Sequence, residues 1–287
     1  TQTVTELVIG PKGDDEARPR LILKEYRDQR AWSQARATAE LTEFVRAQGF
    51  DRGRFRVPRV LARHDHDRYL IEESQRGRSL HALIGVVSAD TAAEYLRATA
   101  HWLARLHALP GDGDAEAGLR RDERRFASYR RAFTGTGNPL AARAEAVLDR
   151  LAADAPARYR NGRLVRAHGD FHPQNIILGQ DLAADPETLF VSVIDFASAM
   201  PAPPALDLGY FLAQFAYQCN ARDRFPDALF LDAYAGGGGV LPPPDAINWF
   251  RVRAIMSIAA HLIRVGMGES PVIGALLAEA EQLLATG

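Results

Sequence analysis

Hydrophobic and polar residues alternate in short runs through the first part of the chain, which is typical of strands. The polar stretch 10–18 separates the first two apolar runs and predicts a hairpin turn. A helical period follows over residues 30–48, with Ala35 and Ala39 on its apolar face and Gly49 as a stop signal. The spacing predicts an antiparallel sheet with one helix, its strands at residues 4–9, 20–24, 57–63 and 68–72.

The pattern becomes mainly helical beyond Gly77, so a second and larger region is expected there. Three short apolar runs interrupt it, at 163–166, 175–178 and 189–194, and are predicted to be strands. The arginine-rich stretch 120–131 is interpreted as a solvated helix face, with the binding of an anionic acceptor as the alternative. The expected helices cover residues 91–109, 206–217, 227–234, 246–265 and 272–284.

The composition is that of a globular protein of 287 residues, with 47% hydrophobic and 25% charged residues. The 35 Lys and Arg against 36 Asp and Glu give a net charge of −1, so there is no basic field to attract nucleic acid or anionic membranes. No apolar run approaches the roughly 20 residues of a membrane span. The single cysteine, Cys219, fits a reducing compartment. We expect a cytoplasmic protein that binds neither nucleic acid nor membranes; its oligomeric state is left open.

The candidate chemistry lies in the octapeptide HGDFHPQN at residues 168–175. Asp170 and Asn175 are five residues apart, which is the spacing of a kinase catalytic loop. A second acid, Asp195, follows the apolar run at 189–194. An aspartate can accept the proton of an acceptor hydroxyl, and an amide oxygen with a second carboxylate can hold Mg²⁺ against phosphates. The residue types predict phosphoryl transfer.

At these residues the chain resembles the aminoglycoside phosphotransferase and choline kinase family, whose HGDxHxxN and IDF patterns are matched by HGDFHPQN and VIDF. The resemblance implies a bilobal, protein-kinase-like α+β fold, in which a small antiparallel-sheet lobe with one helix precedes a larger, mainly helical lobe. It also implies ATP and Mg²⁺ as cofactors, Asp170 as catalytic base, and Asn175 and Asp195 as metal ligands. His168 and His172 would then orient the loop.

The nucleotide site is expected in an N-terminal lobe over residues 1–75, with a hinge at its end, and the catalytic and substrate-binding lobe over residues 76–287. A kinase needs a strand lysine for the nucleotide phosphates and a helix glutamate that positions it. Lys24 ends a predicted strand and Glu40 lies in the following helix, so these two are the expected pair. Glu43, one helical turn further on, is the competing partner.

The segment at 69–74 resembles the family's hinge, where the backbone groups of Glu72 and Ser74 would contact adenine. The chain departs from kinase patterns in having no Gly-x-Gly-x-x-Gly near its start. The glycine-rich stretches 111–118 and 236–244 are interpreted as surface loops, because neither follows a strand and opens a helix as a phosphate-binding loop does.

Two readings of other classes stay open from the residues. His168, Asp170 and His172 suit a metallohydrolase site, since imidazoles and carboxylates bind Zn²⁺ or iron. The second alternative is a kinase-like protein that binds nucleotide without catalysis. The presence of Asp170, Asn175 and Asp195, the three residues that catalysis needs, speaks against it. Asp207 is interpreted as a helix N-cap, and His107 as a packing or capping residue.

The phosphate acceptor is the least determined part of the prediction, because fold does not fix substrate. We expect a small hydroxylated molecule, with amino alcohols, sugars and hydroxylated amino acids equally open. An aminoglycoside antibiotic is the alternative. A polycation favours a strongly acidic pocket, and the region of the final helices offers only Glu269, Glu279 and Glu281 among many apolar residues.

Overall fold

A computed structural model of the chain describes residues 2–10, 18–111, 113–181, 188–221 and 223–286. The chain divides into two compact units, the first formed by Thr1–Leu83 with Gln174–Ser198 and the second by Ile84–Pro173 with Ala199–Gly287. The first unit extends past the lobe boundary predicted after residue 75 and takes in a segment from the middle of the chain. The assignment of nucleotide binding to residues 1–75 stays a prediction.

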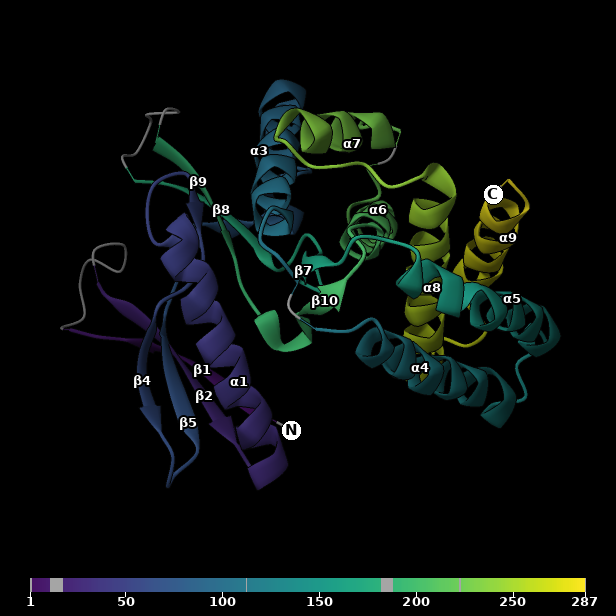
Figure 1. Cartoon of the computed structure of the whole chain (residues 1–287), viewed down its shortest axis with the longest axis horizontal. Helices are drawn as coiled ribbons and strands as arrows, with labels where there is room; N and C mark the ends of the chain where they lie inside the picture. Colours follow the sequence, from purple (N-terminus) through teal and green to yellow (C-terminus); the bar gives the residue numbers. More distant parts are fainter. Residues whose placement is uncertain (1, 11–17, 112, 182–187, 222, 287) are drawn as a thin grey trace. The chain divides into compact units, whose positions relative to one another are not determined.

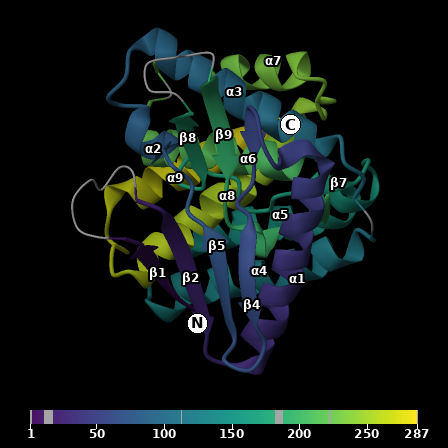
Figure 2. The same cartoon turned by 90° about the vertical axis from the view of Figure 1, so that its left-hand side faces the viewer.

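The first unit contains an antiparallel sheet in the order β1-β2-β5-β4, with α1 along one face (Figure 1, Figure 2). Trp32, Ala35 and Ala39 of α1 form a core cluster with Leu70 of β5. Asp28 caps the helix, because its carboxylate accepts the N–H of Ala31 at 2.8 Å. The predicted antiparallel strand pair and the helix after it are confirmed, whereas residues 11–17 of the predicted turn lie outside the described residues. The elements are β1 Gln2–Val8, β2 Arg20–Tyr26, α1 Gln29–Val45, β4 Val60–His64 and β5 Tyr69–Glu73.

A second sheet of the first unit has the order β3-β9-β8-β6. Its centre is the antiparallel hairpin of β8 and β9, in which Ile176 lies opposite Val193. Every residue of β9 is buried, including Ser192, which accords with a strand that is apolar at its other four positions. The remaining elements of this unit are η1 Arg46–Phe50, β3 Phe55–Arg56, β6 Arg78–Ser79, α2 Leu80–Leu83, β8 Ile176–Gln180, β9 Leu189–Val193 and η3 Phe196–Ser198.

Helices form most of the second unit, and α8 packs against α4, α5, α6 and α9. Its residues are buried almost all round, as expected of a central helix. In the part of the chain that the structure describes, no helix is long and apolar enough to cross a membrane. The elements are α3 Ala89–His107, α4 Glu116–Gly135, α5 Ala141–Arg160, β7 Val165–Ala167, β10 Met200–Ala202, α6 Ala205–Cys219, α7 Asp227–Gly236, α8 Pro244–Arg264 and α9 Pro271–Ala285.

The arginine-rich stretch of α4 is not only a solvated face, because it carries the fully buried Asp122. The Asp122 carboxylate accepts hydrogen bonds of 2.7 Å from the Tyr159 hydroxyl of α5 and from Nε of Arg253 in α8. Burial raises the pKa of Asp122 to about 6, against the opposing effect of Tyr159. Gly118, expected in a surface loop, also lies within α4, where a Cβ would meet the Tyr159 ring at 2.5 Å.

The close contact of α6 with α8 gives a stability prediction. A Cβ on Gly209 would stand 2.6 Å from both the Arg251 nitrogen and the Ile247 carbonyl oxygen, so we expect Gly209→Ala to lower the free energy of unfolding by about 1–3 kcal/mol. Gly274→Ala in α9 is the control, because nothing lies within 4 Å of its Cβ, and it should be neutral or stabilising. Urea denaturation measures both. Equal stability of the two variants would contradict this packing.

Candidate active site

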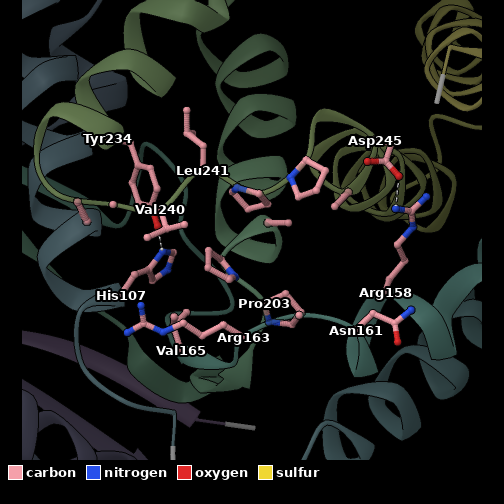
Figure 3. Close-up of a pocket in the computed structure, with 18 of the residues that line it drawn as sticks. His107, Arg158, Asn161, Arg163, Val165, Pro203, Tyr234, Val240, Leu241 and Asp245 are labelled. Atoms are coloured by element: carbon pink, nitrogen blue, oxygen red, sulfur yellow. Dashed lines mark hydrogen bonds and ion pairs between the residues drawn. The ribbon is translucent and has the colours of Figure 1, made fainter.

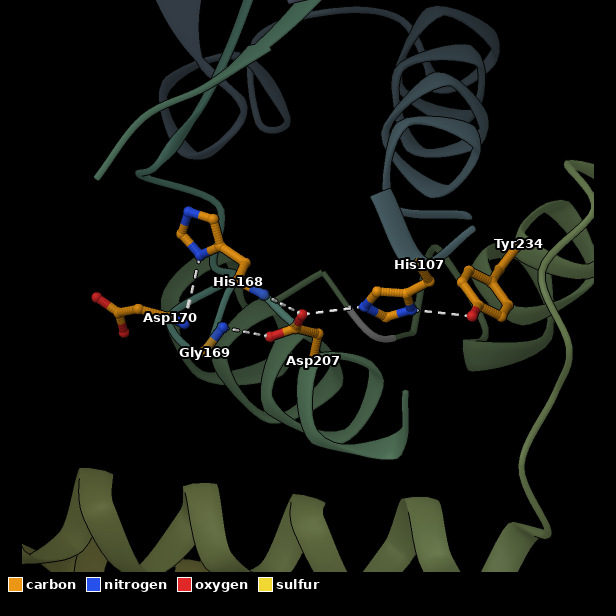
Figure 4. A network of polar contacts seen from close by, with 6 residues as sticks. All are labelled: His107, His168, Gly169, Asp170, Asp207 and Tyr234. Carbon is orange, nitrogen blue, oxygen red and sulfur yellow. Dashed lines mark hydrogen bonds and ion pairs between the residues drawn. The ribbon is translucent and has the colours of Figure 1, made fainter. Parts of the chain in front are cut away.

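The Asp207 carboxylate holds the loop that carries Asp170. Asp207 is fully buried in the first turn of α6, and a buried carboxylate needs hydrogen-bond donors. Its two oxygens accept the backbone N–H groups of His168 at 2.6 Å and Gly169 at 2.7 Å (Figure 4). Gly169 has a φ of +77°, a conformation that glycine adopts without a steric penalty. The loop before Asp170 is therefore fixed through its backbone.

His107 connects Asp207 to Tyr234 on the other side. Its Nε2 lies 3.0 Å from Oδ2 of Asp207, and its Nδ1 lies 2.9 Å from the Tyr234 hydroxyl (Figure 4). A carboxylate only accepts, so Nε2 carries the proton, and in the neutral ring Nδ1 accepts from Tyr234. The hydrogen bonds run from Tyr234 through His107 to Asp207.

The side chains of the loop itself are also held. Phe171 is buried and stacks on Trp102, with ring centroids 5.8 Å apart. The ring of His168 is buried against Phe171, and its Nδ1 accepts the N–H of Asp170 at 3.3 Å. His168 thus contacts its own loop, as its predicted orienting role requires.

Asp170 is a carboxylate with a depressed pKa. Burial acts to raise its pKa, but hydrogen bonding and positive charge from His172, the hydroxyl of Tyr210 and the charge of His168 outweigh burial and lower it to about 2. Nε2 of His172 lies 3.7 Å from the carboxylate. Because the folded-state pKa lies below the usual value, the ionised group stabilises the fold above about pH 4, and this contribution is lost as the pH falls toward 2.

The predicted metal ligands Asn175 and Asp195 lie at one end of the β8–β9 hairpin. Asn175 precedes β8, and its carbonyl oxygen accepts the N–H of Ile194 at 3.0 Å, which extends the ladder by one pair. Asp195 is the next residue, with a φ of +65° that is uncommon outside glycine. The hairpin register therefore places an amide residue and a carboxylate residue at the adjacent ends of two paired strands.

Lys24 lies in β2 and forms a 2.7 Å ion pair with Glu72 of β5. Because Ile22 is opposite Glu72 and Lys24 is opposite Leu70, the two charged residues are diagonal neighbours on one face of the sheet. Tyr26, two residues beyond Lys24, has a pKa raised to about 12, first by burial and then by the charges of Glu72 and Asp195. Glu72, the partner of Lys24, and Asp195, at the end of the hairpin, thus both act on the same residue of β2.

The structure does not bring Glu40 to Lys24. Glu40 is exposed on α1 and pairs with Arg63 at 3.3 Å, whereas the core-facing position beside it is occupied by Ala39. The expected Lys24–Glu40 pair is therefore replaced by Lys24–Glu72. Ser74 also has other partners, since its N–H donates to the Arg20 carbonyl at 3.2 Å and its hydroxyl bonds to a Glu6 carboxylate oxygen. Nucleotide contacts of Glu40, Glu72 and Ser74 stay predictions.

Three residues of this arrangement were missed or misread in the sequence. Asp207 is not an N-cap, because α6 begins two residues earlier, at Ala205. The Asp207 carboxylate instead accepts a backbone N–H of a loop that is distant in the sequence. Tyr210 lies three residues after Asp207, hence on the same helix face, where it reaches Asp170. The segment DLGY at residues 207–210 was the sequence signal for this contact, because it places the tyrosine three residues after the aspartate in a predicted helix. His107 is a link in a hydrogen-bonded chain, which no local pattern indicates.

The metallohydrolase reading has no support in the described residues. Across residues 2–10, 18–111, 113–181, 188–221 and 223–286, no three or more His, Cys, Asp or Glu side chains are grouped so that they could hold a metal ion. His168 directs its Nδ1 to the backbone of its own loop.

Comparison with known proteins gives a family and a fold. The phosphotransferase enzyme family matches residues 12–254. An aminoglycoside-3'-phosphotransferase of type VIII has 20% identity and a TM-score of 0.60, with 87% of this chain and 92% of that chain covered. A Plasmodium vivax ethanolamine kinase has 13% identity and a TM-score of 0.57, covering 98% and 81%.

An aminoglycoside phosphotransferase from Streptomyces rimosus, solved with ADP and streptomycin, has 20% identity and a TM-score of 0.59, covering 82% of this chain and 88% of that chain. No curated protein matches the sequence. At these identities the solved structures show a shared bilobal, kinase-like α+β fold.

The anchoring role of Asp207 gives a prediction. Asp207→Asn replaces one acceptor oxygen by an NH₂ group that faces a backbone N–H, so we expect a loss of about 2–4 kcal/mol in stability. Amide exchange at His168 and Gly169, followed by NMR, should become faster. Asp232→Asn on the exposed side of α7 is the matched control. Unchanged stability and unchanged exchange would show that the carboxylate does not hold the loop.

Proposed function

Because the chain belongs to the phosphotransferase enzyme family, we propose that it is an ATP- and Mg²⁺-dependent kinase that transfers the γ-phosphoryl group to a hydroxyl of a small molecule. The observation that carries the proposal is the ionised Asp170 on a loop fixed by Asp207. Solved structures of the same fold with ADP or GDP bound support the nucleotide.

Asp170 is proposed to orient the acceptor hydroxyl and to take its proton. A carboxylate with a pKa near 2 remains ionised at neutral pH and is a weak base. Such a base suits phosphoryl transfer, in which positioning and electrostatics supply most of the catalysis and the hydroxyl proton leaves as the new P–O bond forms. The γ-phosphoryl group then passes directly to the hydroxyl oxygen while its bond to ADP breaks, and no covalent enzyme intermediate is needed.

The end of the β8–β9 hairpin is the proposed site of a Mg²⁺ ion. Asn175 and Asp195 supply an amide oxygen and a carboxylate, which are hard oxygen ligands, and Mg²⁺ usually takes only one or two carboxylates with phosphate and water as the rest. Bound there, the ion would neutralise charge on the phosphates.

Lys24 is proposed to bind the nucleotide phosphates. Its ammonium group pairs with Glu72, and both Glu72 and Asp195 act on Tyr26, two residues from Lys24 on β2. Glu72 forms the ion pair with Lys24 that was expected of Glu40.

The charged residues around Asp170 indicate which class of phosphate acceptor the site favours. Arg121 of α4 acts on it as a cation, and His172 lies beside it. Arg125, four residues after Arg121 on α4, pairs with Asp122 and acts on Arg121. This environment disfavours a polycation such as an aminoglycoside and favours a neutral or anionic hydroxylated acceptor. We therefore prefer an acceptor that binds to the arginine-rich stretch as an anion to an aminoglycoside antibiotic.

The base is tested by Asp170→Asn in an assay of ADP formation with a panel of sugars, hydroxylated acids, amino alcohols and aminoglycosides. We expect turnover to fall at least about 10²-fold with little change in the KM for ATP, because the amide cannot take the proton. Asp149→Asn, the same change at an exposed site of α5, is the control. Neutral and acidic acceptors should outperform aminoglycosides. Full turnover in Asp170→Asn would contradict the assigned base, and no turnover of wild type with any acceptor would favour a non-catalytic nucleotide-binding protein.

The metal site is tested by Asp195→Ala, with Asp181→Ala at the other end of the same hairpin as the control. We expect Asp195→Ala to lose turnover by at least about 10²-fold at saturating Mg²⁺, since a ligand is removed while the hairpin ladder remains. Circular dichroism checks that the fold is retained. Turnover that needs no divalent cation would disprove the role of both Asn175 and Asp195.

A further inference from the structure

A cavity of about 500 Å³ lies within the second unit (Figure 3). Its walls come from the ends of α3 and α5, the start of α6 and the segment between α7 and α8. The volume falls in the range of about 300–1,000 Å³ that is typical of small-molecule sites. Asp170 is not among the residues that line it. The cavity therefore differs from the proposed phosphoryl-transfer site.

The lining of this cavity is mainly apolar with polar groups at its ends. Alanine, valine and proline side chains form much of the wall, and Val240 and Leu241 are 66% and 42% exposed there. His107 and Tyr234 lie at one end, and the ion pair of Arg158 with Asp245 lies at the other (Figure 3). An occupant with an apolar body would cover the exposed side chains of the segment after α7.

Among the described residues of the lining, one arginine is left without a carboxylate partner. Both carboxylates of the wall are taken by arginines: Asp154 pairs with Arg150 at 3.1 Å and Asp245 with Arg158 at 2.5 Å. The exposed Arg163 forms no ion pair with any described residue, and its charge acts on Tyr234. A guanidinium beside an apolar wall is suited to a carboxylate.

We propose that this cavity binds a small amphipathic acid, with an aliphatic body along the apolar wall and a single carboxylate at Arg163. The apolar lining supplies affinity, and Arg163 selects the anion over a neutral or cationic compound of the same length.

Occupancy of the cavity is coupled to the loop of Asp170 through hydrogen bonds. Tyr234 and His107 line the cavity, and His107 joins Asp207, whose oxygens accept the amides of His168 and Gly169. In Figure 4, Asp170 lies on the other side of Asp207 from Tyr234. Tyr234 is fully buried and Gly239, in the segment after α7, lies against its ring. A ligand that packs on this segment restrains the ring and through it the chain of hydrogen bonds. Binding at the cavity does not rest on the proposed function; its effect on turnover does.

The ligand class is tested by calorimetric titration of the full chain with decanoate, decanol and decylamine below their micelle-forming concentrations. Decanoate should bind about tenfold more tightly than decanol, and decylamine most weakly, because one exposed charge-assisted contact is worth about 1.4 kcal/mol. Arg163→Glu should remove this preference, whereas Arg97→Glu, an exposed arginine of α3 outside the cavity, should keep it. Failure of decanoate to bind, or an equal affinity for decanol, would overturn the proposal.

The coupling is tested by amide exchange at His168 and Gly169 with and without decanoate. We expect exchange to slow severalfold in wild type and to be unaffected by decanoate in Tyr234→Phe, which keeps the apolar ring but removes the hydroxyl that bonds His107. Titration confirms that this variant still binds. The coupling would be refuted if decanoate slowed amide exchange in Tyr234→Phe. It would also be refuted if wild-type protein bound decanoate without any slowing of exchange. Because exchange needs no turnover, these results are independent of whether Asp170 is the base.

Discussion

A buried carboxylate that must be satisfied by donors organises the second unit. Asp207 receives two backbone amides from the loop and one imidazole N–H from His107, so its charge is matched by three donors from outside its helix. Removal of any donor leaves part of a buried charge without compensation, which makes this geometry hard to distort. The loop that contains His168 and Gly169 is therefore held in place, and Asp170, the next residue, has Tyr210 and His172 as neighbours.

The first unit reaches its arrangement by a different route, through strand register. The pairing of β2 with β5 sets Lys24 diagonally from Glu72, and the pairing of β8 with β9 sets Asn175 beside the residue that precedes Asp195. The β8–β9 pairing is maintained by packing, because every residue of β9 is buried and each is paired with a residue of β8. The candidate phosphate and metal ligands are therefore positioned by the packing of their neighbours.

Sequence patterns predicted the parts of this protein that depend on local spacing. The β1–β2 hairpin, α1 and the late helices follow from periodicity, and the order of Asp170, Asn175 and Asp195 indicated the chemistry. Helix α5 was not predicted, since its buried face includes small alanines and it contains Pro156. The Lys24–Glu72 pair depends on a strand register that spacing does not reveal. Asp122, in a stretch of arginines, is buried because two other helices supply its donors.

The central claim is that Asp170 directs an acceptor hydroxyl onto the γ-phosphorus in a single step. The most direct measurement is the stereochemistry of transfer from ATP whose γ-phosphorus is made chiral with oxygen isotopes, with an acceptor that the enzyme turns over. The account predicts inversion of configuration at phosphorus, since one displacement occurs. Retention would require two displacements through a phosphorylated enzyme and would contradict the account.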